Sequence, residues 1–117
     1  MLKQIPEMIK LLDLLAKNGI DVDYKTIEWP VDLLSPSLEE RADFVQLILK
    51  DGGSNWICDV ICHPGSYGYE QGLLEIMAHE GYEQTVLGDD ATGTVVGWLT
   101  AEKALEYFKR GWKAKNS

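Results

Sequence analysis

Apolar residues recur every third or fourth position near the N-terminus, and this spacing predicts a helix over residues 5–18. Pro6 suits the first helical turn, and Asn18-Gly19 provides a left-handed stop. Strict alternation over residues 20–26 then predicts a half-buried strand that ends before Pro30.

A second alternating stretch, residues 56–63, predicts a largely buried strand. We expect one face to hold Trp56, Cys58, Val60 and Cys62, and the other Ile57, Asp59 and Ile61. Residues 95–99 predict a further strand.

Two segments are ambiguous. Charged residues between 39 and 50 share a helical face, and Ser37 with Glu40 forms a capping box. The apolar run 44–49 followed by the turn sequence of residues 51–55 instead favours a strand and hairpin. Residues 73–79 are compatible with either a strand or a short helix.

Thr100 can cap a closing helix, with Glu102 in its positive first turn and Gly111 as its stop. The basic tail, residues 112–117, is expected to fray. Together the pattern predicts one small α+β domain over residues 1–117. It has an N-terminal helix, an antiparallel sheet of about four strands, and a C-terminal helix packed with the first on one face.

The charged residues are unevenly distributed along the chain, and this distribution limits the possible functions. The 117 residues have a net charge of −8, which argues against a general nucleic-acid binder. Residues 51–102 hold nine acidic residues and no Lys or Arg, whereas residues 103–117 hold one acid and five bases. The N-terminal apolar stretch is interrupted by charges, which excludes a signal peptide or a membrane span, so we expect a cytoplasmic protein.

Zinc or thiol chemistry would have to use Cys58, Cys62, His63 and His79. Residues four apart on a strand are about 13 Å apart, too far to share a zinc ion with bonds of ~2.3 Å. A Cys62–His79 nucleophile pair has no neighbouring Lys or Arg to lower the thiol pKa. We therefore assign no catalytic residue, metal ligand or cofactor, and expect a protein that is not an enzyme.

Two further candidate sites, a glycine-rich phosphate loop and a carboxylate cation site, are not supported by the residue spacing. Gly65, Gly68 and Gly72 match no phosphate-binding spacing and indicate a tight turn. Asp89-Asp90 lacks the alternating ligands of an EF-hand.

An interaction surface is the remaining candidate, because Tyr67 and Tyr69 lie in a glycine-rich connection that can present side chains outward. Acidic residues flank them. The candidate surface comprises Tyr67, Tyr69, Glu70, Glu80, Glu83, Asp89 and Asp90.

The run SYGYEQGLLEI at residues 66–76, preceded by Cys62-His63 and followed by Gly97-Trp98-Leu99-Thr100-Ala101-Glu102, is distinctive. It resembles small uncharacterised proteins of phages and prophages of Gram-positive bacteria, over about residues 43–108. The resemblance implies a strand-turn-strand unit before the motif, which favours a strand at 43–50. It also implies an accessory gene rather than a metabolic enzyme.

These expectations favour an accessory protein that acts by protein–protein contact on a host or phage protein with a basic groove, in the host cytoplasm. In a sharper version, the acidic stretch mimics nucleic-acid phosphates and inhibits a host factor. Two alternatives stay open: a self-associating structural module, such as a homodimer formed through an exposed strand, and a small zinc- or thiol-dependent protein. Direct contact with nucleic acid or a membrane is not expected.

Overall fold

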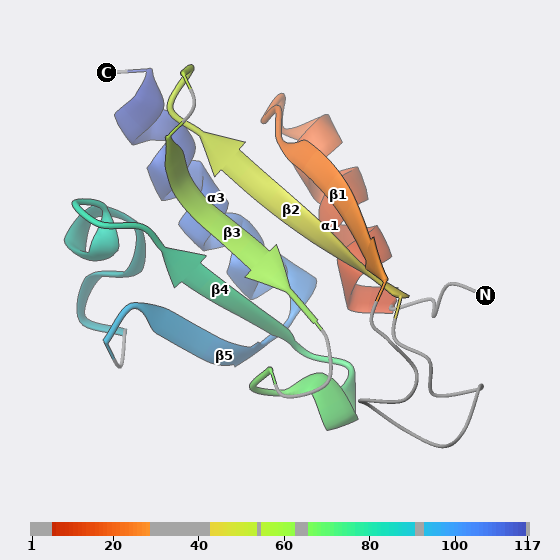
Figure 1. Cartoon of the computed structure of the whole chain (residues 1–117). Helices are drawn as coiled ribbons and strands as arrows, with labels where there is room; N and C mark the ends of the chain where they lie inside the picture. The colour runs from red at the N-terminus through yellow and green to blue at the C-terminus, as the bar shows by residue number, and fades with distance from the viewer. Residues whose placement is uncertain (1–5, 29–42, 54, 63–65, 91–92, 117) are drawn as a thin grey trace.

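The computed structural model describes residues 6–28, 43–53, 55–62, 66–90 and 93–116. Five antiparallel strands form one sheet in the order β1-β2-β3-β4-β5, and helices α1 and α3 lie side by side behind it (Figure 1). The elements are α1 (Pro6–Lys17), β1 (Asp23–Glu28), β2 (Asp43–Lys50), β3 (Trp56–Ile61), η2 (Tyr69–Gln71), β4 (Leu74–Ala78), η3 (Glu83–Leu87), η4 (Gly88–Asp90), β5 (Val95–Leu99) and α3 (Ala101–Lys115).

The α+β class is confirmed, with an N-terminal helix, an antiparallel sheet and a C-terminal helix that contacts both. Both ambiguous segments contribute strands: β2 matches the strand expected at 43–50, and β4 settles residues 73–79. The alternative capping box of Ser37 and Glu40 lies outside the described residues. β1 begins three residues later than the alternation predicted, at Asp23.

Helix α1 forms where the sequence predicted it, because its apolar stripe meets the core. Met8, Leu11 and Leu15 are buried, and the helix ends where Gly19 adopts a positive φ of 68°. Ile20 and Val22 then pack against the same core before β1 begins.

The register divides the sheet into two faces. Residues paired across antiparallel strands point to the same side, and neighbours along a strand point to opposite sides. The side that faces the helices carries two rows of buried residues. These rows are Leu47, Val60 and Ile76, and Leu49, Cys58 and Ala78.

The opposite side carries the row Ile48, Asp59 and Met77. Within the described ranges no helix covers this side, as the view onto the sheet shows (Figure 1). We call it the helix-free face. Trp56 and Ile57 both depart from the expected alternation at the irregularity between β2 and β3. Ile57 joins the core and approaches α3, whereas Trp56 does not share the core side with Cys58 and instead packs against His79.

The expectation that Gly111 ends the last helix is wrong. α3 continues through Gly111 to Lys115, so residues 112–115 are helical, and fraying of this basic tail stays a prediction. A Cβ at position 111 would lie 2.8 Å from Leu49 Cδ2 and 3.2 Å from Ile57 Cγ2. Glycine therefore allows the helix to pack closely on the sheet, and any larger residue would displace these side chains, a constraint that its sequence position does not reveal.

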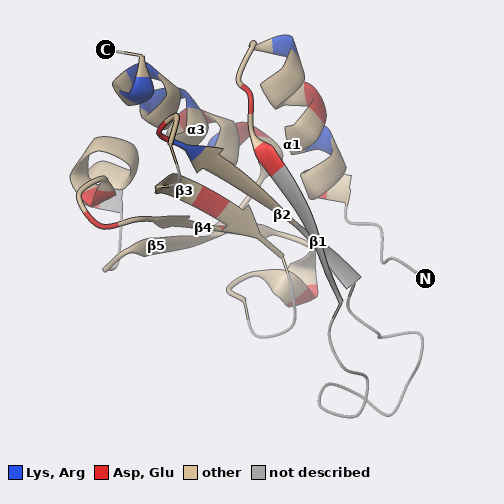
Figure 2. Cartoon of the chain, turned by 45° about the horizontal axis from the view of Figure 1, so that its top comes forward, with Lys and Arg blue, Asp and Glu red and all other residues tan. Residues whose placement is uncertain are grey.

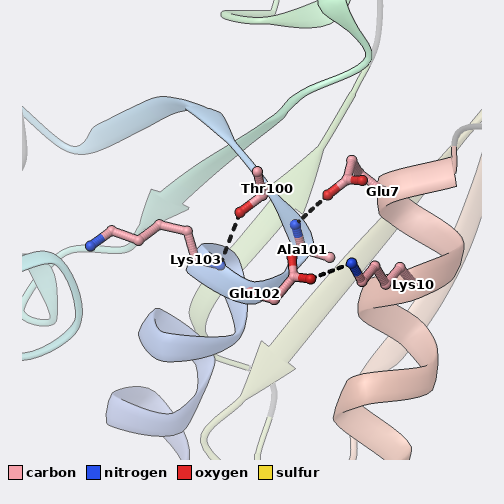
Figure 3. Close-up of polar contacts among 6 residues, drawn as sticks. All are labelled: Glu7, Lys10, Thr100, Ala101, Glu102 and Lys103. Carbon is pink, nitrogen blue, oxygen red and sulfur yellow. Dashed lines mark hydrogen bonds and ion pairs between the residues drawn. The ribbon is translucent and has the colours of Figure 1, made fainter.

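The start of α3 is fastened to α1, as Figure 3 shows. Thr100 caps the helix as predicted, with its hydroxyl accepting from the Lys103 amide at 3.3 Å. A second acceptor comes from the other end of the chain: the Glu7 carboxylate accepts from the Ala101 amide at 2.7 Å. Lys10 and Glu102 form an exposed ion pair beside it, which raises the pKa of Lys10 and lowers that of Glu102.

Candidate functional site

The two distinctive sequence motifs meet in space. The turn that contains Tyr67 lies against the end of β5, where the Trp98 amide donates to the Tyr67 carbonyl at 3.3 Å. The two rings stack, with centroids 5.1 Å apart and planes inclined by 17°. Both rings remain accessible, since Tyr67 is 51% exposed and Trp98 is 58% exposed.

Glycines make this approach sterically feasible. Gly68 has a φ of 95°, and a Cβ there would lie 3.0 Å from both Trp98 Cα and Leu73 Cβ. A Cβ on Gly97 would collide with the Tyr67 side chain. The turn itself is closed by the Leu73 amide, which donates to the Gly68 carbonyl at 2.9 Å. The glycines of the first motif therefore serve a tight turn, as predicted for Gly68 and Gly72; Gly65 lies outside the described residues.

Trp98 is held in an uncommon backbone conformation. Its φ of 53° is the one positive value at a non-glycine position among the described residues. The register explains it: β4 advances from Leu74 to Ile76 while β5 spans Val96 to Leu99, so β5 has an extra residue at this point. Such a bulge redirects a side chain, and backbone strain of this kind concentrates at functional sites.

The aromatic pair borders a pocket of about 410 Å³, which we call the aromatic pocket. Its lining consists of Ser66, Tyr67, Gly68, Tyr69, Glu70, Gln71 and Trp98. This volume is within the usual range for sites that bind small molecules. Just outside the lining, the Glu75 carboxylate accepts from the Tyr67 amide at 3.1 Å and helps to fix the turn.

The structure does not bring the seven candidate surface residues together. Tyr67, Tyr69 and Glu70 precede β4 and line the aromatic pocket, although Tyr69 also packs against the core. The other four, Glu80, Glu83, Asp89 and Asp90, follow β4, at the opposite end of that strand (Figure 1). Five strand residues separate the two groups by about 13 Å.

The second acidic group lies beside the basic helix. Arg110 of α3 donates to the Val86 carbonyl of η3 at 3.1 Å, and its guanidinium covers the Tyr107 ring at 5.2 Å. Within Figure 2, the Lys and Arg residues of the described chain gather mainly on α1 and α3. The Glu83 carboxylate accepts from the Gly81 amide at 2.9 Å. Arg110 therefore ties η3 to α3 through a backbone carbonyl, whereas the described lining of the aromatic pocket holds no basic residue.

A polar cluster on the helix-free face was missed by the sequence reasoning. The Asp59 side chain is only 8% exposed; its Oδ2 accepts from Gln46 Nε2 at 2.8 Å, and its Oδ1 is hydrogen-bonded to His79 Nε2 at 3.0 Å. Trp56 packs edge-on against His79, with centroids 5.1 Å apart. An aspartate inside an otherwise apolar strand was the available signal, because a buried carboxylate requires partners.

The zinc and thiol alternatives find little support in this arrangement. Cys58 and Cys62 are free and buried, and burial, followed by the nearby Asp59 charge, raises the pKa of the Cys58 thiol. An activated nucleophile requires the opposite shift. Cys58 points toward the helices, whereas His79 lies with Asp59 on the other face. In the described ranges no three His, Cys, Asp or Glu side chains are placed to hold a metal ion; His63 falls outside them.

Across the described residues, no helix is both long and apolar enough to cross a membrane. A scan against protein-family models found no match, and searches of curated proteins and of solved structures found none either.

Proposed function

We propose that this chain is a non-catalytic protein-binding module that engages a basic partner protein through the aromatic pocket. The observation that carries the proposal is the stacked Tyr67–Trp98 pair, exposed by more than half and held by a strained backbone. The distinctive motif favours an accessory protein of a phage or prophage as its biological setting.

Exposed aromatic residues of this kind are typical energetic centres of protein interfaces. Trp and Tyr are enriched among residues whose truncation weakens binding most, because they bury a large area with few rotatable bonds. Here the glycine packing and the bulge in β5 set the backbone positions from which both rings project, and the rings already stack on each other without a partner. A preorganised pair loses little conformational entropy on binding.

The charge of the segment around the aromatic pocket favours a positively charged partner. Residues 51–102, which include Tyr67, Glu70 and Trp98, contain no Lys or Arg, so this segment presents no like charge to a positively charged surface. Fewer acidic residues are available to a basic partner than the nucleic-acid mimic hypothesis assumed. Asp59 is buried and Glu75 and Glu83 bond to backbone amides, which leaves Glu70 as the exposed carboxylate in the pocket lining.

The test compares partner capture by the wild type and by Trp98→Ala, in extract from the source cells, followed by binding measurements with the purified partner. Ile9→Ala is the matched control, because Ile9 is also a half-exposed hydrophobic residue but lies on α1. We expect Trp98→Ala to weaken binding to the purified partner at least tenfold, ~1.4 kcal/mol, with Ile9→Ala unchanged. Equal affinity for all three proteins would contradict the proposal.

Self-association is the competing function, since a second copy can cover the same rings. Sedimentation of the wild type and Trp98→Ala over a wide concentration range separates the two. A monomer in both cases supports a foreign partner, whereas a wild-type dimer that Trp98→Ala dissociates assigns the pocket to self-assembly.

A further inference from the structure

We propose that the aromatic pocket receives an arginine side chain of the partner, with its guanidinium stacked on the Tyr67–Trp98 pair and paired with Glu70. This inference rests on the proposed binding function and specifies its ligand. It depends on three features of the pocket: the exposed rings, the carboxylate in the lining, and the lack of a basic residue in the part of the lining that the structure describes.

The rings offer a surface that attracts cations. A cation above the face of Trp or Tyr is attracted by the ring quadrupole within about 6 Å of the centroid. The chain uses this interaction elsewhere: Lys103 lies 5.9 Å and Arg110 lies 5.2 Å from the Tyr107 centroid, and Lys115 lies 4.9 Å from that of Trp112. All of these cations come from α3 itself, next to the rings that they cover.

The aromatic pocket has the same chemistry, and no cation of the described residues is found over its rings. None of the described lining residues is Lys or Arg, and Glu70 places an exposed carboxylate among them. Glu75 adds a second negative charge next to the lining, anchored on the Tyr67 amide. The pocket is therefore complementary to a cation that the chain does not supply from residues 51–102.

Arginine fits this arrangement better than lysine. Its planar guanidinium stacks on an aromatic face while its edge donates two parallel hydrogen bonds to one carboxylate. The ammonium group of lysine is compact and strongly hydrated, so it loses more hydration in the same position. A phosphate group would be repelled by Glu70 and Glu75, which excludes a nucleic-acid backbone as the occupant.

The experiment uses a hexa-arginine peptide, with hexa-lysine and the neutral hexa-citrulline peptide as comparisons. Titration into the isotopically labelled full chain is followed through the Trp98 indole and Tyr67 signals. We expect the arginine peptide to shift both signals, the lysine peptide to bind more weakly, and the citrulline peptide to shift neither. Glu70→Gln is expected to weaken arginine binding about threefold to fivefold.

The matched control is Glu80→Gln, which removes the same charge from an exposed position after β4. Equal weakening by both variants would show unspecific attraction to an acidic protein and overturn the inference. A citrulline peptide that shifts Trp98 equally would also overturn it, while leaving the pocket as a binding site. If Trp98 signals move with protein concentration alone, the occupant is a second copy and the inference is wrong. If no peptide shifts Trp98 and Trp98→Ala retains full partner binding, the proposed function fails as well.

Discussion

The two faces of the sheet use the same five strands for different purposes. The face on which α1 and α3 pack carries aliphatic residues and Cys58, and these residues form the hydrophobic core. The helix-free face carries the buried carboxylate of Asp59 and Met77, which is 39% exposed. The difference shows that an alternating strand pattern predicts which residues are buried, but does not predict whether helices or other groups bury them.

Two neighbours on β3 make the contrast concrete. Cys58 points into the apolar core, where burial raises the pKa of its thiol. Asp59, one residue later, points the other way and is buried as well, but its two oxygens each accept a hydrogen bond. One position is stabilised by apolar packing and the next by a polar network.

The largest expected effect distinguishes the faces by stability. Leu49→Ala, on the helix side, removes a fully buried side chain and is expected to lower the free energy of unfolding by about 3 kcal/mol. Met77→Ala, its counterpart on the helix-free face, is expected to cost less than about 1 kcal/mol, because Met77 is 39% exposed. Urea denaturation measures both. Similar losses would mean that the helix-free face is as well packed as the other.

The second prediction concerns the polar cluster. Asp59→Ala leaves Gln46 and His79 without their acceptor and is expected to lower stability by about 2 kcal/mol. The double variant Asp59→Ala/His79→Ala is the control: if the pair is coupled, it costs less than the sum of the two single changes. Additive losses would show that Asp59 and His79 stabilise the sheet independently.

A third prediction uses pH. The folded-state pKa of Cys58 lies above its ordinary value of 9.0, so the unfolded chain releases the thiol proton first as pH rises. The thiol therefore stabilises the fold fully below pH 9, and this contribution falls above it, by about 1.4 kcal/mol at pH 10. Denaturation of the wild type and Cys58→Ala between pH 8 and about 10 tests this: the stability difference between the two must shrink at the alkaline end. A constant difference would contradict the assignment.

The smallest expected effect tests the strained backbone at the pocket. At an ordinary strand position glycine is less stable than alanine, but at position 98 the positive φ reverses this order. Trp98→Gly is expected to be about 1 kcal/mol more stable than Trp98→Ala. The same pair of substitutions at Met77, in a regular part of β4, should show the opposite order. Alanine as the more stable residue at both positions would mean that the bulge relaxes once the ring is removed.

Most of the elements were predictable because they depend on local periodicity. The 3.6-residue spacing before Lys17, the alternation in β3, and the Thr100 cap each follow from residues close in sequence. Residues 73–79 stayed ambiguous, since a segment of seven residues with five apolar positions fits a strand or a short helix equally well. Gly111 was misjudged because local propensity was the sole available criterion, whereas its packing partners lie on β2 and β3.

The sequence by itself determined the α+β class, the position of the helices and most strands, and a charge distribution that leaves residues 51–102 without a base. The tertiary structure decided which of those residues form a site. Tyr67 meets Trp98 across 31 positions of the chain, and Glu7 accepts from Ala101 across 94. The tertiary structure also placed Tyr67 at the opposite end of β4 from Glu80, Glu83, Asp89 and Asp90. Periodicity fixes how a segment folds locally, but which segments meet depends on sheet register and packing, which arise only when the whole chain buries its apolar surface.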